Sequence, residues 1–243
     1  KIMSNLSNNF IAGDWVKGSS SISNINPSDT SDVIGEYAQA NNAQLEDALN
    51  SSQIAQKQWA ATGLEQRQAV LMKIGEEMMA RSAELGELLS REEGKPVAEG
   101  KGEIYRAGQF FTYYAAEVLR QSGDTADSVR PNIEIDVRRE AMGTVAIISP
   151  WNFPTATASW KIAPALAFGN AVIWKPANLT PASAVALTEI IARQDIPKGL
   201  FNLVMGSGSS IGQALAESPK VHAISFTGSY DVGLQIAGAA AKN

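Results

Sequence analysis

The chain has 243 residues, 44% of them hydrophobic, and a formal net charge of −5. These values fit one large globular domain, or one domain with an appendage. Basic residues are scattered without a cluster, which argues against nucleic acid or an anionic membrane as the main partner. No apolar run is long enough to span a bilayer, and the start "KIMSNLSNNF" is too polar for a signal peptide, so we expect a soluble, cytoplasmic protein.

The absence of cysteine excludes disulfides, thiolate metal sites and cysteine nucleophiles within these residues. The single histidine, His222, excludes a histidine-rich metal cluster, and we predict no metal site. Because His222 stands at the start of the apolar run "VHAISF", a structural or surface role is favoured over a catalytic one.

The first half of the chain changes from turn-rich to helical periodicity. Residues 8–37 mix short apolar pieces with turn residues, which predicts short strands and hairpins. Helical spacing then predicts a helix over residues 42–59, one long helix carrying Leu71 to Leu88 that ends at "REEGKP", and a third helix over about 104–118. The apolar positions expected in the core are Leu45, Ala48, Leu49, Ala55, Trp59, Leu71, Ile74, Met78, Leu85, Leu88, Ile104, Ala107, Phe111 and Val118.

The stretch "PNIEIDVRRE" alternates Ile133, Ile135 and Val137 with charged residues. This period of two predicts a strand with one solvated face, which fits a sheet edge awaiting a partner. We therefore divide the chain into three parts. Residues 1–130 form strands and helices that pack on the core domain, residues 131–142 form an edge strand or oligomerisation hairpin, and residues 143–243 form the core domain.

After Gly143 the chain repeats an apolar strand, a turn and a helix. The strands read "TVAIIS", "AVIWK", "FNLVM" and "HAISF", and helices are expected to begin near Thr157, Thr180, Ser209 and Tyr230. Thr180 followed by a proline is typical of a helix start with a capping hydroxyl. The alternation predicts an α/β fold with a parallel sheet covered by helices on both faces, and ligands bind such sheets beyond the carboxyl ends of the strands.

The segment "IISPWNFP" runs a strand into Asn152, which stands between two prolines. Each proline limits the backbone around it, so the Asn152 amide is presented rigidly. A neutral donor beyond a strand end suits stabilisation of a developing oxyanion, although an ordinary turn has the same composition.

Two glycine-containing turns, "GSGSSIG" and "ISFTGSYDVG", each follow a strand and open a helix. Their helix N-termini favour negative charge, and two adjacent ones suit a diphosphate, while plain strand-to-helix turns remain the alternative. Lys175 ends the strand "AVIWK", where it can donate to ribose hydroxyls or a phosphate, or simply be solvated.

Phe153, Thr157 and Trp160 fall on one face if a helix begins here. That face is predicted to form an apolar passage for a small substrate, with core packing as the alternative.

Together these segments resemble the N-terminal half of an aldehyde dehydrogenase of the broad NAD(P)-dependent superfamily. The most specific pieces are "SPWNFP", "WKIAPALAFGNAVIWKPAN", "GSGSSIG" and "ISFTGSYDVG", and the resemblance covers nearly the whole chain. It implies a Rossmann-like NAD(P)-binding sheet, here incomplete and truncated before the catalytic domain, and a homo-oligomer, either dimer or tetramer, when complete.

The resemblance also implies roles for individual residues. In the family an enzyme thiolate attacks the aldehyde, an amide matching Asn152 helps to hold the oxyanion, and hydride passes to the nicotinamide before the thioester is hydrolysed. The residue matching Lys175 contacts the ribose, and the one matching Ser229 approaches the pyrophosphate. The expected cofactor-binding residues are Ile148, Ser149, Pro150, Trp151, Lys175, Ala177, Asn178, Gly208, Ser209, Gly212, Phe226, Thr227, Gly228, Ser229 and Val232.

Two departures from the family pattern matter. Many NAD-preferring relatives have glutamate where this chain has the neutral Asn178, so we expect dual or NADP-leaning use. The general-base glutamate and nucleophilic cysteine of the family lie beyond the motif matching "FTGS", and this sequence ends at Asn243 without them. As written the chain cannot perform the reaction.

Three interpretations follow. The first is the cofactor half of an aldehyde dehydrogenase, most similar to enzymes for small acidic semialdehydes such as succinic or 2-oxoglutaric semialdehyde. The second is a non-catalytic dinucleotide-binding stub. The third is a subunit-interface piece that pairs through "IEIDVRRE".

Overall fold

The computed structural model describes residues 6–243, and its centre is a six-stranded sheet in the order β11-β8-β9-β10-β2-β3. The strands are β2 (Asn9–Ile11), β3 (Asp14–Val16), β8 (Thr144–Ile148), β9 (Ala171–Lys175), β10 (Phe201–Leu203) and β11 (Ala223–Phe226). The last four are mutually parallel, and the β2–β3 hairpin joins β10 in antiparallel fashion. The predicted parallel sheet is therefore confirmed.

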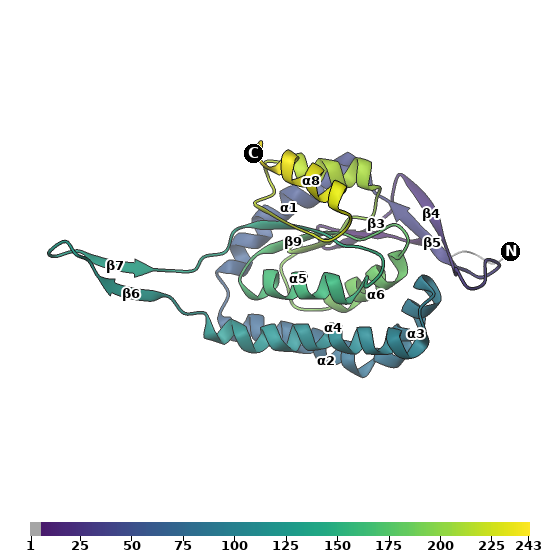
Figure 1. Ribbon diagram of the computed structural model, residues 1–243, viewed down its shortest axis with the longest axis horizontal. Coiled ribbons are helices and arrows are strands. Elements are labelled where there is room, and N and C mark those ends of the chain that lie inside the picture. The colour runs from purple at the N-terminus through teal and green to yellow at the C-terminus, as the bar shows by residue number, and fades with distance from the viewer. Residues whose placement is uncertain (1–5) are drawn as a thin grey trace.

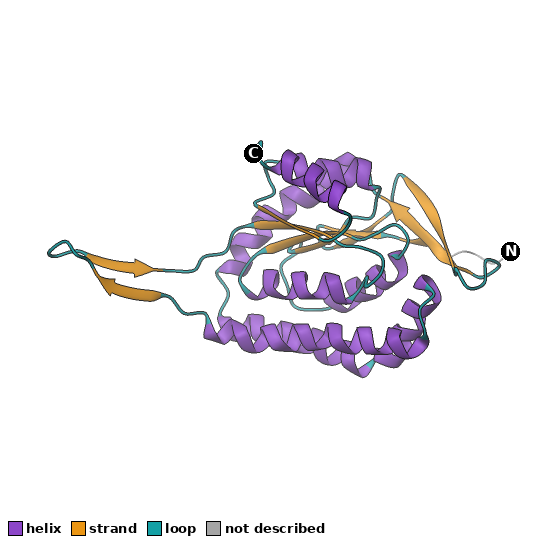
Figure 2. Cartoon of the chain, viewed as in Figure 1, coloured by secondary structure: helices purple, strands orange, loops and turns teal. Residues whose placement is uncertain are grey.

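Helices cover both faces of this sheet (Figures 1 and 2). One face carries α1 (Asn42–Ala60), α7 (Gln213–Glu217) and α8 (Tyr230–Ala240), and the other carries α5 (Ala156–Ala167) and α6 (Pro181–Ala192). An outer layer, α2 (Leu64–Ala80), α3 (Ser82–Glu93) and α4 (Val97–Glu117), packs against α5 and α6. A 3₁₀ turn, Val118–Arg120, and a π turn, Gly208–Gly212, complete the helical segments described. The α/β class predicted from the repeated units is confirmed.

A smaller sheet lies at the N-terminal side of the molecule (Figure 1). It has the order β1-β5-β4, with β1 (Leu6–Ser7), β4 (Ser20–Ile25) and β5 (Val33–Gln39). The strands predicted within residues 8–37 are thus confirmed, but they serve two sheets.

The core between the helical layers contains the apolar faces predicted from periodicity. Trp59, Ile74 and Phe111 are completely buried, and Leu88 is partly buried against them. The Trp59 indole donates to the Leu166 carbonyl at 2.8 Å, which ties α1 to α5. Burial of such large side chains supplies most of the driving force that holds the layers together.

The single long helix predicted through Leu71 and Leu88 is wrong, because the chain forms two helices, α2 and α3. At Arg81 the backbone leaves the helical region (φ −97°, ψ 15°), which changes the direction of the chain. Arg81 forms ion pairs with Glu77 before this turn and Glu84 after it, at 2.8 and 2.7 Å. The turn lets both helices pack against α4.

The predicted capping hydroxyl at Thr180 is also wrong. Thr180 does precede α6, and Pro181 is its first residue, but the buried Thr180 hydroxyl has no hydrogen-bond partner among the described residues. The cap comes from Glu92 at the end of α3, whose carboxylate accepts bonds from the Ala182 and Ser183 amides. A carboxylate satisfies these orphan donors better than a hydroxyl because it also offsets the positive end of the helix dipole.

A hairpin of β6 (Asp124–Asp127) and β7 (Glu134–Val137) extends away from the body between α4 and β8 (Figure 1). The predicted strand in "PNIEIDVRRE" is β7. The expectation of a single solvated face is wrong, because the apolar side chains of Ile135 and Val137 are about half exposed along with their charged neighbours. No helix within residues 6–243 has the length and hydropathy needed to cross a membrane.

Candidate functional site

A cavity of about 520 Å³ opens where β8, β9 and β11 end and α8 begins. This is the edge at which parallel α/β sheets bind ligands. Eleven of the predicted cofactor-binding residues line it together with Asn152: Ile148, Ser149, Pro150, Trp151, Lys175, Ala177, Phe226, Thr227, Gly228, Ser229 and Val232. Three segments far apart in the sequence therefore meet at one place.

Asn152 is exposed at this cavity on the turn that follows β8. The turn is anchored on both sides. Before it, the buried Ser149 hydroxyl accepts a hydrogen bond from the Trp174 indole at 2.9 Å. At Asn152 itself, the main-chain carbonyl accepts a bond from the Lys95 ammonium at 2.9 Å. The side-chain amide remains available as a donor of two hydrogen bonds, which is what a developing oxyanion requires.

Lys175 is only 5% exposed at the end of β9, and its ammonium donates to the Pro176 carbonyl at 2.9 Å. Burial lowers the pKa of Lys175 to about 8. An ammonium has three donors, so the remaining ones suit a hydroxyl or phosphate that enters the cavity. A Cβ on Gly212 would lie 3.6 Å from Lys175 Cδ, which shows that the "GSGSSIG" turn packs against this lysine.

The third wall is the turn from β11 into α8. A Cβ added at Gly228 would lie 2.5 Å from Phe226 Cζ, so glycine lets the backbone lie against this ring. Ser229 precedes the helix with extended backbone (φ −70°, ψ 152°), and its side chain makes no cap bond among the described residues. The free amides of the first turn of α8 therefore face the cavity rim, where they suit an anionic group.

The remaining predicted cofactor residues lie outside the cavity wall. Asn178 is exposed on the loop between Lys175 and α6, and Gly208 and Ser209 are exposed at the start of the π turn. Gly212 is buried and reaches the site only through its contact with Lys175.

The structure separates the three residues of the predicted face, Phe153, Thr157 and Trp160. The helix α5 begins at Ala156, so Phe153 precedes it, and Thr157 is 3% exposed whereas Phe153 and Trp160 are 51% and 42% exposed. Thr157 belongs to the core.

Phe153 and Trp160 instead line a groove between α4 and α5. A cavity of about 470 Å³ there is also lined by Arg106 and Phe110, and the Phe110 and Trp160 rings meet edge to face at 5.7 Å. Arg106 is exposed and forms no ion pair within residues 6–243. The groove thus combines aromatic walls with one available cation.

Sequence reasoning missed Lys95, Glu103 and Arg106. Lys95 stands in "REEGKP", a stretch that indicates a helix end, and Glu103 and Arg106 lie on a helix whose periodicity marks only its apolar face. The signal available was an acidic residue on the buried face of that helix, because Glu103 falls between Gly100 and Ala107, which are both buried.

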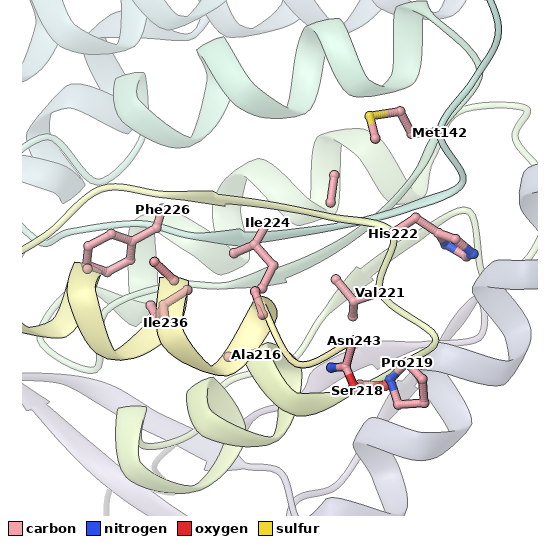
Figure 3. Close-up of a pocket in the computed structure, with 14 residues that line it drawn as sticks. Met142, Ala216, Ser218, Pro219, Val221, His222, Ile224, Phe226, Ile236 and Asn243 are labelled. Carbon is pink, nitrogen blue, oxygen red and sulfur yellow. The ribbon is translucent and has the colours of Figure 1, made fainter.

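A larger cavity, of about 850 Å³, lies elsewhere, between β11, α7 and α8 (Figure 3). Its walls are mostly apolar, as at Val221, Ile224 and Ile236, and it contains no cluster of groups suited to catalysis. His222, at its edge, accepts a hydrogen bond from the Thr144 amide at 3.0 Å through Nδ1, which confirms the structural interpretation of this residue. Within residues 6–243 no group of three histidine, cysteine, aspartate or glutamate side chains is placed to hold a metal ion.

Comparisons with known proteins agree with this geometry. A model of the aldehyde dehydrogenase family matches residues 15–243. An alpha-ketoglutaric semialdehyde dehydrogenase of Bacillus subtilis is 38% identical over 234 residues, which are 96% of this chain and 48% of that protein.

Solved structures give the same result. An NADP-dependent enzyme of Escherichia coli is similar with a TM-score of 0.94 and 35% identity, over 97% of this chain and 49% of that one. A betaine aldehyde dehydrogenase of Staphylococcus aureus in complex with NAD+ has a TM-score of 0.94 and 30% identity, over 98% and 48%. The chain spans about half the length of these relatives. The protein therefore belongs to the aldehyde dehydrogenase family.

Proposed function

We propose that this chain is the dinucleotide-binding half of an enzyme that oxidises an aldehyde to a carboxylate with NAD or NADP as acceptor. The observation that carries the proposal is the cavity shared by Asn152, Lys175 and Ser229 at the ends of three parallel strands. An amide donor, a buried ammonium and a helix N-terminus are the three groups that oxyanion stabilisation and dinucleotide binding need.

Each group has a distinct task in this proposal. Asn152 donates a hydrogen bond to the aldehyde oxygen as negative charge develops on it. Lys175 donates to the ribose hydroxyls, and the α8 N-terminus at Ser229 binds the pyrophosphate. The nicotinamide, when bound, accepts the hydride. The sequence contains no cysteine, so in this proposal the nucleophilic thiolate and the general-base glutamate belong to a part of the enzyme outside these 243 residues.

The cofactor is either NAD or NADP, with a leaning to NADP. Asn178 carries no charge, so it does not repel a 2′-phosphate as a carboxylate would. Both cofactors occur among similar structures: the Escherichia coli enzyme is NADP-dependent, and the Staphylococcus aureus enzyme was solved with NAD+. Dissociation constants for the two cofactors test this point, and strong exclusivity for NAD would contradict it.

The substrate class we propose is a small aldehyde with a distal carboxylate. Arg106 is exposed in the groove lined by Phe153 and Trp160, where its guanidinium can pair with a carboxylate. The Bacillus subtilis relative is named for such a substrate. Glu99 and Glu103 also line this groove, and Glu103 is already paired with Lys95. Arg106 is the cation of the groove, so recognition of an acidic substrate depends on it.

A non-catalytic dinucleotide-binding module is the second candidate. The specific observation in its favour is the complete absence of cysteine from the sequence. In that case the cavity would bind a dinucleotide without any turnover.

Expression of the complete reading frame separates the two candidates. We expect the frame to continue past Asn243 into a glutamate and a cysteine, and its product to oxidise succinic or 2-oxoglutaric semialdehyde with release of NADH or NADPH, measured at 340 nm. Asn152→Ala is expected to lower kcat by about 10²- to 10³-fold, because one oxyanion donor is lost. The exposed Asn42→Ala at the start of α1 is the matched control and should have no effect.

Two outcomes would contradict the enzyme proposal. A frame that ends at Asn243 with intact dinucleotide binding would favour the module. An active enzyme that keeps its kcat in the Asn152→Ala variant would remove the proposed role of this amide.

For the substrate class, Arg106→Met should raise KM for acidic aldehydes and leave KM for neutral ones unchanged.

A further inference from the structure

Three charged side chains form a buried cluster beneath the turn that carries Asn152. Glu93 is the last residue of α3, Lys95 stands in the connection to α4, and Glu103 lies on α4. The Lys95 ammonium is 2.8 Å from a carboxylate oxygen of Glu93 and 2.8 Å from one of Glu103. The side chains of Lys95, Glu93 and Glu103 are 8%, 9% and 1% exposed, so these ion pairs are largely shielded from solvent.

The cluster also contacts the catalytic turn directly. The Lys95 ammonium also donates to the Asn152 carbonyl at 2.9 Å, and it lies 4.2 Å from the centre of the Phe153 ring. The other oxygen of Glu103 accepts hydrogen bonds from the amides of Thr155 and Ala156, at 3.0 and 3.1 Å. The chain is therefore held at Asn152 and again three and four residues later.

The net charge of the cluster suits its position at the N-terminus of α5. Two carboxylates face one ammonium, and the excess negative charge lies at the N-terminus of α5, where the helix dipole stabilises it. Burial raises the pKa of Glu93. Burial also lowers the pKa of Lys95, but the bonds to Glu103 and Glu93 outweigh this effect, and the net shift is upward. Lys95 thus keeps its proton at neutral pH, and with it both hydrogen bonds and the ion pair with Glu93.

A purely structural clamp would not need the bond to Asn152. The pairs with Glu93 and Glu103 alone fasten the end of α3 to α4, and Glu103 alone caps α5. The additional bond restrains one peptide group, the one that presents the oxyanion donor. A displacement of about 1 Å in such a group costs about 10²-fold in rate.

We propose that Lys95, aligned by Glu93 and Glu103, is a positioning residue for Asn152: it holds the Asn152 peptide so that the side-chain amide points to a fixed place in the cavity. This inference rests on the proposed function, because it assumes that the Asn152 amide acts on the substrate. Lys95 itself touches no reacting atom.

The first test uses the 243-residue chain labelled with ¹⁵N. Lys95→Met is expected to broaden or multiply the Asn152 side-chain NH₂ signals, since the turn then samples several positions. Lys101→Met, which removes an exposed lysine from the adjoining helix α4, should leave these signals unchanged. Glu93→Gln weakens the cluster without touching Asn152, keeps the pair of Lys95 with Glu103, and is expected to alter the signals less than Lys95→Met.

Signals of Asn152 in Lys95→Met that coincide with those of the wild type would overturn the proposal. So would an equal perturbation in Glu93→Gln, because the cluster would then act only through general packing. If Lys95→Met does not fold, Lys95→Arg replaces it: the charge is kept, the contact point is moved, and a smaller change of the Asn152 signals in the same sense is expected.

The second test uses the product of the complete reading frame. Lys95→Met should lower kcat by about 10- to 100-fold while KM for the dinucleotide stays within twofold, and Lys95→Arg should recover part of kcat. An unchanged kcat in Lys95→Met beside a strongly reduced one in Asn152→Ala would refute the positioning role alone. An unchanged kcat in Asn152→Ala would refute the proposed function of that amide, whatever the NMR signals of Lys95→Met show.

Discussion

Lys175 is the residue at which binding and stability are expected to conflict. Its ammonium is almost completely removed from water, and the bond to Pro176 compensates it only in part. The lowering of its pKa from 10.5 to about 8 corresponds to roughly 3 kcal/mol of destabilisation of the charged form in the folded chain. A buried charge held at such a cost is typical of a binding site.

We therefore expect Lys175→Met to stabilise the chain and weaken dinucleotide binding. Because the pKa of Lys175 is lowered on folding, burial of its charge destabilises the folded chain fully below pH about 8. This destabilisation decreases as the pH rises and is gone above the unfolded value of about 10.5. Urea unfolding at pH 7 should show Lys175→Met to be more stable by up to about 3 kcal/mol, with the difference shrinking between pH 8 and 10.5. Fluorescence titration should show dinucleotide affinity reduced by about tenfold or more.

Lys101→Met is again the matched control, and it should change neither quantity. Equal stability of the wild type and Lys175→Met at pH 7, together with equal dinucleotide affinity, would show that Lys175 is an ordinary strand-end lysine.

At the residue scale, the sequence predicts those site residues that directly follow a strand, but not those that reach the site from a distant segment of the chain. Asn152, Lys175 and Ser229 each follow a strand that the sequence announces, so the sheet topology alone brings them to one edge. Lys95 and Glu103 reach the turn from 57 and 52 residues away. Their roles depend on how α4 packs against α5, which no local pattern specifies.

At the scale of elements, the contact between α3 and α6 has the clearest energetic content. The Glu92 carboxylate accepts bonds from Asn24 and Ala182, and from both the amide and the hydroxyl of Ser183 at 2.9 and 2.6 Å. This single side chain completes the first turn of α6 and joins it to the outer helical layer.

Glu92→Ala is expected to lower the free energy of unfolding by about 2 to 4 kcal/mol, because buried amides lose their acceptor. Thermal unfolding followed by circular dichroism measures this change. Glu87→Ala, an exposed residue of the same helix, should shift the midpoint by no more than about 1 °C. Similar midpoints for the two variants would mean that water replaces the Glu92 cap at no cost.

The two errors at this scale have a common origin. The division of the predicted long helix at Arg81 and the replacement of the Thr180 cap by Glu92 both depend on tertiary contacts of the outer layer. Periodicity correctly predicts the buried faces of α2 and α3, because burial imposes the helical period on apolar residues. It carries no information about where one helix ends and the next begins when the apolar pattern continues through the turn.

For the whole molecule, the hairpin β6–β7 is the feature that stands apart from the body (Figure 2). Its described residues make a two-stranded sheet that pairs with no other strand, and Ile133, Ile135 and Val137 are each about half exposed. An isolated hairpin is marginal in water unless its apolar side chains are covered.

We expect this hairpin to hold subunits together. Replacement of residues 124–137 by a short Gly-Ser link should reduce the mass measured by size-exclusion chromatography with light scattering, and change the thermal midpoint of the monomer fold little. Ile135→Lys with Val137→Lys should act in the same direction without any change of length. An unchanged assembly in both variants would exclude the hairpin as the main interface.

The general architecture followed from the repeated strand and helix units, but the edge of the main sheet did not. Nothing local indicates that the hairpin of β2 and β3 adds to β10, because antiparallel hairpins carry the same alternation wherever they dock. Only the assembled sheet assigns them their neighbours.

That pairing has a consequence for the order of events during synthesis. The Ala12 amide is bonded to the Asn202 side chain, 190 residues later in the chain. At a translation rate of about 5–20 residues per second, the N-terminal hairpin waits roughly 10 to 40 s on the ribosome before its partner strand exists. During that interval the edges of the hairpin are unpaired. The strands made first, β2 and β3, therefore complete the edge of the central sheet only after β10 has emerged.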